Sequence, residues 1–81
     1  MNKIEGNEQY YNESFDKQTL LSFAVSGTEF EECEFNDCDF SSAAFTRCNF
    51  LNCSFNRCNL SLINVLHSRF FEVDFTDCKL E

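Results

Sequence analysis

Apolar residues return along this chain at every fifth position. Counting in steps of five from Phe15 to Leu80, all fourteen positions hold Phe, Leu or Val. A second register lies two residues before each of these, and from Phe23 onward it holds small or apolar side chains, including all six cysteines. The pattern therefore predicts a repeated five-residue unit with two side chains directed inward and three directed outward.

A period of five fits neither regular secondary structure. On a helix, at about 100° per residue, the apolar side chains would circle the axis, and on a flat strand an odd step would place them on alternate faces. A chain that bends in the same direction at every unit buries them all. We therefore predict an all-β solenoid whose successive coils stack about 4.8 Å apart through backbone hydrogen bonds.

Individual units show a resemblance to a known family. Asp37-Cys38-Asp39-Phe40-Ser41 and Asn52-Cys53-Ser54-Phe55-Asn56 resemble pentapeptide repeats, which have a central Phe or Leu and a small residue two positions earlier. The resemblance is close from Thr28 to Leu80 and looser from Phe15. It implies a right-handed quadrilateral β-helix of about 3.5 coils, with about 20 residues in each coil.

Side chains 20 positions apart should then stack in columns. Outside the tube, Arg57 should lie between Asp37 and Asp77 in a ladder of alternating charge. The expected inward columns are Phe30/Phe50/Phe70, Phe35/Phe55/Phe75, Phe40/Leu60/Leu80, Val25/Phe45/Val65 and, in the second register, Phe23/Ala43/Ile63.

The two ends of the chain give different expectations. Residues 1–12 are polar and contain only Tyr10 in register, so we predict an N-terminal lead or cap at 1–12 and the solenoid at 13–81. At the C-terminus, Cys78 and Leu80 are ordinary repeat residues with no polar segment after them. The last coil should therefore expose an apolar layer and unpaired backbone, which favours either an end-to-end homodimer or a longer natural chain.

The net charge of the chain limits the kinds of molecule that it can bind. The 81 residues form one small domain with six Lys and Arg against fourteen Asp and Glu, a net charge of −8. Phosphate groups of nucleic acids or of anionic membranes would be repelled. The chain has no apolar run of about 18 residues and no signal-like apolar start, so we expect a cytoplasmic protein.

The residues that could act in catalysis, metal binding or phosphate binding are not placed together by the sequence pattern. The cysteines lie in the inward register without a CxxC pair, so we interpret them as free thiols that fill space in the core. His67 lies in an outward register and is not expected to reach a thiol. Gly6 and Gly27 are isolated, so there is no phosphate-binding loop. We therefore predict no catalytic residues, no metal, no cofactor and no enzymatic activity.

Two surface features are candidate binding sites. The first is an acidic segment, interpreted either as a solvated face or as a docking surface for a basic partner; it comprises Glu29, Glu31, Glu32, Glu34, Asp37 and Asp39. The second is a set of outward apolar residues, interpreted either as one patch around a corner or as scattered exceptions; it comprises Leu51, Leu62, Leu66 and Phe71.

Two functions are compatible with these features. The first is a non-enzymatic, rigid scaffold for an unidentified protein partner. The second follows from the resemblance, because Cys-rich and Phe-rich pentapeptide proteins are similar to those that protect DNA gyrase from quinolones or peptide toxins as acidic mimics of duplex DNA. A rod of about 17 Å covers only about ten phosphate charges. Mimicry therefore requires a longer protein, of which this chain is a fragment, or an end-to-end dimer.

Overall fold

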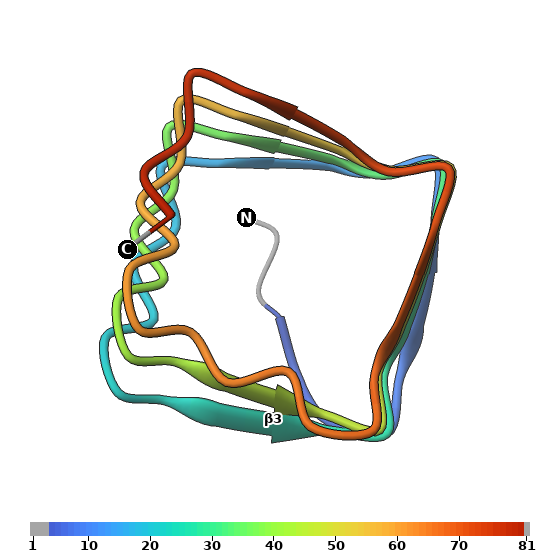
Figure 1. The fold of residues 1–81 in the computed structure, drawn as a ribbon. Helices are drawn as coiled ribbons and strands as arrows, with labels where there is room; N and C mark the ends of the chain where they lie inside the picture. The colour runs from blue at the N-terminus through green and yellow to red at the C-terminus, as the bar shows by residue number, and fades with distance from the viewer. Residues whose placement is uncertain (1–3, 81) are drawn as a thin grey trace.

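The chain forms a square tube of stacked coils, shown in Figure 1 by a computed structural model that describes residues 4–80. Viewed from the C-terminal end, the chain runs counter-clockwise toward the viewer, so the solenoid is right-handed. All ten strands within residues 4–80 are three residues long. That part of the chain contains no helix long and apolar enough to cross a membrane.

Each wall of the tube is a ladder of parallel strands or bridges. The first wall contains β1 (Gln9–Tyr11), β4 (Glu29–Glu31), β7 (Asn49–Leu51) and β9 (Arg69–Phe71). The second contains β2 (Ser14–Asp16), β5 (Glu34–Asn36), β8 (Ser54–Asn56) and β10 (Asp74–Thr76). The third is formed by bridges that link Thr19, Asp39, Asn59 and Lys79. The fourth contains β3 (Ala24–Ser26) and β6 (Ala44–Thr46).

The strand register confirms the 20-residue coil. Phe30 pairs with Phe50, and Phe50 pairs with Phe70. Their rings stack in the lumen with centroids 4.8 Å and 4.7 Å apart, close to the spacing of the strands themselves. Rings from neighbouring walls meet edge to face, as Phe40 and Phe45 do at 5.5 Å. The core is thus a set of aromatic columns that also contact one another across the lumen.

The corners of the square rest on a regular backbone feature. Every fifth residue from Asn7 to Asp77 has a positive φ, between 53° and 72°. Glycine adopts this left-handed conformation without steric cost, and Asn tolerates it better than most residues. Only Gly27 is a glycine at this position, and a Cβ there would lie 2.5 Å from the Asn7 side-chain oxygen. Most corners are therefore closed by residues that bear a conformational cost.

Leu62 has a φ of 57°, so its backbone adopts the unfavourable left-handed conformation. Because Leu62 is also 74% exposed, its side chain gains little stabilisation from packing. We predict that Leu62→Asn raises the free energy of unfolding by about 0.5–1 kcal/mol, since the left-handed conformation is less unfavourable for Asn. Chemical denaturation followed by circular dichroism measures the change. Leu66→Asn is the control, because Leu66 is also exposed but has no positive φ. Equal effects at both positions would contradict the backbone explanation.

Most side chains of the second inward register are hydrogen-bond donors. The Cys58 thiol donates to the carbonyl oxygen of Phe35, 23 residues earlier, at 3.1 Å. The Ser68 hydroxyl does the same toward Phe45 at 2.6 Å. Thr28 and all six cysteines make the equivalent contact. Burial raises the pKa of Cys48, which keeps that thiol protonated and able to donate. The thiols therefore bond the coils together as well as filling space.

A short backbone hydrogen bond closes the corner after the third wall in each coil, and it explains why one column lacks donor side chains. A bond of the same kind occurs once after the fourth wall, from the Ser68 N–H to the Val65 carbonyl oxygen at 3.0 Å. After the third wall, the backbone N–H of Ala43 donates to the carbonyl oxygen of Phe40 at 3.0 Å. Phe23 and Ile63 make the same short bond in their own coils. The turn itself supplies the donor there, so no thiol or hydroxyl is needed. The column Phe23/Ala43/Ile63 accordingly contains no Cys, Ser or Thr.

The start of the coils, the burial of Phe23 and the ion pairs of Arg57 differ in whole or in part from what the sequence predicts. The coils begin earlier than residue 13, because Asn7 is already bonded to Ser26 and β1 pairs with β4. The expected burial of Phe23 in its column is wrong, since this residue is 48% exposed, whereas Ala43 in the same column is 1% exposed. Arg57 forms an ion pair with Asp37 at 2.8 Å, and within residues 4–80 no second ion pair to Asp77 accompanies it.

Candidate interaction surfaces

The N-terminal end of the lumen is closed by the chain itself. Ile4 is 1% exposed and belongs to the same buried cluster as Phe15 and Val25. Its position is secured by two hydrogen bonds of the next residue. The Thr28 hydroxyl donates to the Glu5 carbonyl oxygen at 2.6 Å, and the Glu5 N–H donates to the Tyr10 hydroxyl at 3.0 Å. Ile4 therefore acts as a plug at the start of the tube.

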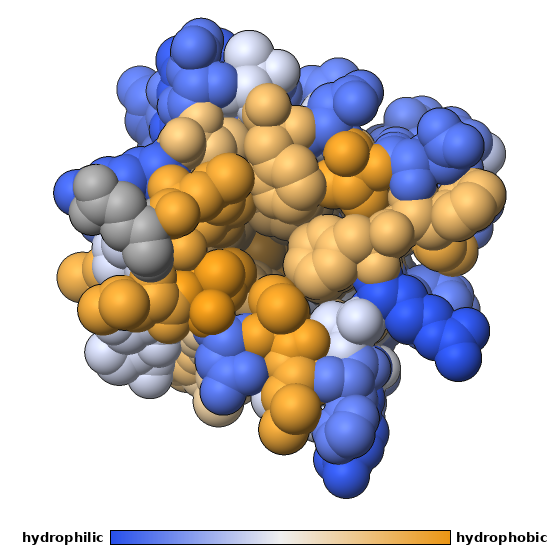
Figure 2. Space-filling view, viewed as in Figure 1, coloured by the Kyte–Doolittle hydropathy of each residue, from blue (hydrophilic) through white to orange (hydrophobic). Residues whose placement is uncertain are grey.

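The C-terminal end of the lumen has no such plug within the described residues. Phe70, Phe75 and Leu80 occupy the inward register of the last coil, yet they are 39%, 44% and 61% exposed. Figure 2 shows this end as an apolar surface rimmed by polar residues. A hollow of about 270 Å³ opens among them, and its lining is apolar throughout: Phe45, Phe50, Phe55, Leu60, Ile63, Val65, Phe70, Phe75 and Leu80. We call these exposed residues and this hollow the C-terminal apolar end.

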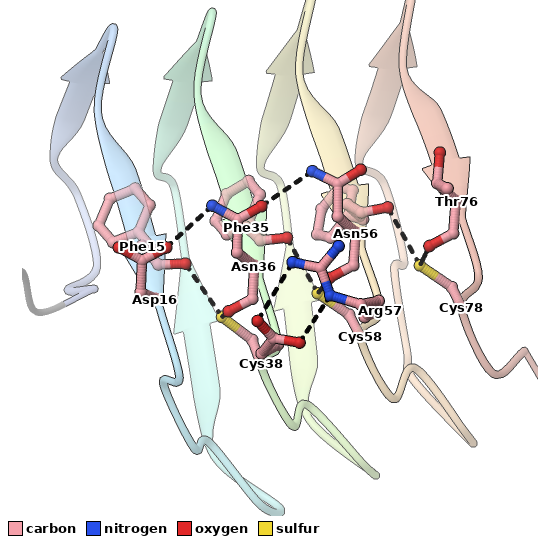
Figure 3. A network of polar contacts seen from close by, with 12 residues as sticks. Phe15, Asp16, Phe35, Asn36, Cys38, Asn56, Arg57, Cys58, Thr76 and Cys78 are labelled. Carbon is pink, nitrogen blue, oxygen red and sulfur yellow. Dashed lines mark hydrogen bonds and ion pairs between the residues drawn. The ribbon is translucent and has the colours of Figure 1, made fainter.

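Polar ladders run up the outside of the second wall and its corner (Figure 3). The Asn56 amide donates to the Asn36 side-chain oxygen, and the Asn36 amide donates to Asp16, both at 2.9 Å. The Arg57 guanidinium donates to both carboxylate oxygens of Asp37 and lowers the pKa of that carboxyl. The Arg57–Asp37 pair is solvent-exposed and therefore contributes little to stability, whereas the bond between Asn56 and Asn36 is partly buried.

The predicted acidic segment forms a belt and not a single face. Glu29 and Glu31 lie on the first wall, Glu34 lies on the second, and Asp39 lies on the third. Glu32 occupies the corner between the first two walls, and Asp37 occupies the next corner. The belt surrounds the second coil on three sides. Its use as a docking surface stays a prediction.

The predicted apolar patch is only partly brought together by the strand register. Leu51 and Phe71 are directly paired on the first wall, where they line a shallow pocket with Arg69. Leu66 ends the fourth wall one corner earlier, and Leu62 lies at the corner before that. Leu51 is half-buried, whereas the other three are exposed. A continuous patch around these corners stays a prediction.

The single histidine and the cysteines lie on different sides of the tube wall. His67 is exposed at a corner, whereas the cysteines are directed into the tube. In the same part of the chain, no three His, Cys, Asp or Glu side chains are placed to hold a metal ion. The titratable groups are spread over the outer walls, and Glu29 and Arg69 line the pocket on the first wall.

Thiol accessibility gives a direct test of the coil arrangement. Five of the six cysteines are buried, and only Cys78, in the last coil, is partly exposed. We predict that a thiol reagent such as Ellman's reagent modifies Cys78 rapidly in the native protein and the other five only after denaturation. The Cys78→Ser variant should lose the rapid phase. Rapid modification of several thiols in the folded variant would contradict the inward placement.

Sequence reasoning did not identify Ile4 or the donor role of the thiols. Ile4 is a single apolar residue outside the five-residue register, so the pattern gives it no assigned place. A signal for the donors was available, since the column of Phe23, Ala43 and Ile63 differs from the other three in lacking hydrogen-bonding side chains. The reason for that difference is visible only in the structure, where the turn after the third wall supplies the donor.

Comparison with known proteins places the repeat in a family. A search of curated proteins gives no match. Among solved structures, the chain matches a trypsin-treated form of QnrB1, a plasmid-mediated fluoroquinolone resistance protein, with 14% identity and a TM-score of 0.46. The match covers 90% of this chain and 51% of QnrB1, so the chain spans about half the length of that structure. The family model described as the pentapeptide repeat region matches residues 28–81, and the chain belongs to the pentapeptide repeat family.

Proposed function

We propose that this chain is a non-enzymatic, rigid protein-binding module that docks through its C-terminal apolar end. One observation carries the proposal. The two ends of the same lumen differ, because Ile4 closes the first and Phe70, Phe75 and Leu80 are exposed at the second. Contiguous exposed apolar surface with a polar rim is typical of interaction sites. The walls, by contrast, are covered mainly by polar and charged side chains.

The geometry of the walls supports a binding role over a catalytic one. Each wall is a ladder of parallel strands or bridges, and its side chains repeat at the spacing of the coils. The thiols serve as donors to backbone carbonyls, which leaves them directed away from solvent. Such a surface presents side chains at fixed distances, set by the spacing of the coils, to another protein.

The proposal is tested by site-specific cross-linking in cells that produce the chain. A photoreactive amino acid at position 80 is compared with the same amino acid at position 62, where Leu62 is exposed at a corner of the tube. We expect a defined protein adduct from position 80 and none from position 62. Adducts from position 62 alone, or no adduct from position 80, would argue against docking through the C-terminal apolar end.

A second candidate function, mimicry of duplex DNA toward gyrase, is favoured by the charge distribution. Residues 1–40 contain ten acids and two lysines, a net charge of −8. The length of a single copy opposes this candidate, because the shortest dimension of the molecule is 21 Å, which spans only roughly 12 phosphates at one charge per about 1.7 Å of duplex. A gyrase supercoiling assay with a quinolone tests this candidate. Protection that is lost in a Glu29→Gln/Glu34→Gln variant would support it, and unchanged inhibition by the drug would oppose it.

A further inference from the structure

The pocket on the first wall holds unpaired charges of both signs. Glu29 and Arg69 occupy one outward column two coils apart, and Asn49 lies between them in the strand register. Within residues 4–80, these three side chains form no ion pair and no hydrogen bond. The pocket has a volume of about 490 Å³ and is lined by Glu29, Asn49, Leu51, Arg69, Phe70 and Phe71.

A comparison with the corner after the second wall shows why these charges do not meet. Asp37 and Arg57 are one coil apart, and their side chains form an ion pair at 2.8 Å. On the first wall the successive coils are 4.8 Å and 4.7 Å apart, as its stacked rings show, so roughly 9.5 Å separates Glu29 from Arg69 at the backbone. That separation leaves room for a ligand with a cationic group at one end and an anionic group at the other.

The size of this gap favours a small zwitterion. When Glu29 and Arg69 both extend straight outward, two charge-assisted hydrogen bonds of about 2.8 Å each occupy about 6 Å of the separation. About 4 Å then remains between the ammonium nitrogen and the carboxylate oxygen of the ligand. An α-amino acid carries both groups on one carbon and fits this length, whereas each further residue of a peptide adds up to about 3.5 Å.

An apolar pair lies beside the charged column. Leu51 and Phe71 are paired in the next outward column of the same wall. Leu51 is half-buried, and Phe71 is 61% exposed. Leu51 shares a strand with Asn49, and Phe71 shares a strand with Arg69. A ligand held at the charged column can therefore bury an apolar side chain against this pair.

We propose that this pocket binds a free α-amino acid with an apolar side chain. Arg69 binds the carboxylate, Glu29 binds the ammonium group, and Leu51 and Phe71 contact the side chain. The planar guanidinium can donate two parallel hydrogen bonds to a carboxylate, which fixes the orientation of the ligand. The ligand is small, so we expect a dissociation constant of about 1 mM.

Titration of the ¹⁵N-labelled full chain with L-leucine, followed by NMR, tests the site. We expect saturable shifts of the backbone N–H signals of β4, β7 and β9, and none in β8 of the second wall. N-acetyl-leucine lacks the ammonium group and leucinamide lacks the carboxylate, so each should bind at least about tenfold more weakly. Glycine, which has no apolar side chain, should also bind more weakly. Shifts spread equally over both walls, or equal binding of the four compounds, would overturn the proposal.

Matched variants test the two charged residues separately. Arg69→Gln should weaken leucine binding at least about tenfold, whereas Arg57→Gln removes the same charge from another corner and should leave binding unchanged. Glu29→Gln and Glu34→Gln form the corresponding pair for the ammonium group, since Glu34 lies on the second wall. Spectra of the unbound variants show directly whether each one is folded. Equal effects within either pair would contradict the assigned contacts.

A dipeptide distinguishes a free amino acid from a peptide as the ligand. Leucyl-glycine has both charged groups but holds them further apart, so it should bind more weakly than leucine. Tighter binding of the dipeptide would overturn the assignment to an amino acid. None of these results depends on cross-linking from position 80, so this site and the proposed function are tested independently.

Discussion

Replacing Phe35 by Ala is expected to lower the free energy of unfolding by about 3–5 kcal/mol, close to the whole contribution that a core of this size supplies. Phe35 is fully buried, and its ring stacks on Phe15 at 5.2 Å and on Phe55 at 4.4 Å. The substitution leaves a cavity with aromatic walls above and below it. Because each coil is fixed by its neighbours, the cavity cannot collapse without breaking strand pairs on the second wall.

Phe75→Ala is the matched control for this loss. Phe75 belongs to the same column but stacks only on Phe55, at 5.3 Å, and it is 44% exposed. Its truncation should cost about 1 kcal/mol, since less apolar surface is removed from water. Chemical denaturation followed by circular dichroism measures both variants. Similar losses in the free energy of unfolding at Phe35 and Phe75 would contradict the explanation that buried stacking within this column stabilises the fold.

Replacing Ile4 by Ala is expected to cost about 2–4 kcal/mol, although it lies near the end of the chain. Ile4 closes the lumen over Phe15 and Val25, so truncation exposes the first aromatic layer to water. Hydrogen exchange should show the loss first in residues of β1 and β2. Denaturation curves give the overall change.

Leu21→Ala provides the comparison for Ile4, because Leu21 is a similar aliphatic residue that is 54% exposed. We expect its free energy of unfolding to stay within about 0.5 kcal/mol of the wild type. A loss at Ile4 no larger than that at Leu21 would show that residues near the start of the tube do not stabilise the coils.

Most of the fold was predictable because each five-residue unit of the sequence forms one side of one coil. Phe30, Phe50 and Phe70 share a register in the sequence and a column in the tube, so counting positions was sufficient. Phe23 shows the limit of counting. It has the right register, but it is exposed whereas Ala43 in the same column is buried, a difference that the period does not encode.

The candidate surfaces were less accessible to sequence reasoning. The exposed layer at the C-terminal end followed from the register of Leu80, but its contrast with the other end depends on Ile4, which no pattern marks. The acids at Glu29, Glu34 and Asp39 are close in sequence, and the corners distribute them over three walls. Nearness along a solenoid chain therefore does not imply a shared face.

The different corner after the third wall has a consequence for how such a chain can change in length. The Phe40 carbonyl is bonded by the Ala43 N–H, whereas the Phe35 carbonyl is bonded by the Cys58 thiol one coil later. A deletion or insertion of a single pentapeptide would rotate every later unit by one wall and place donor side chains where the turn already supplies one. Only gains and losses of about twenty residues keep each unit on its own wall, so members that share this arrangement should differ in length by whole coils.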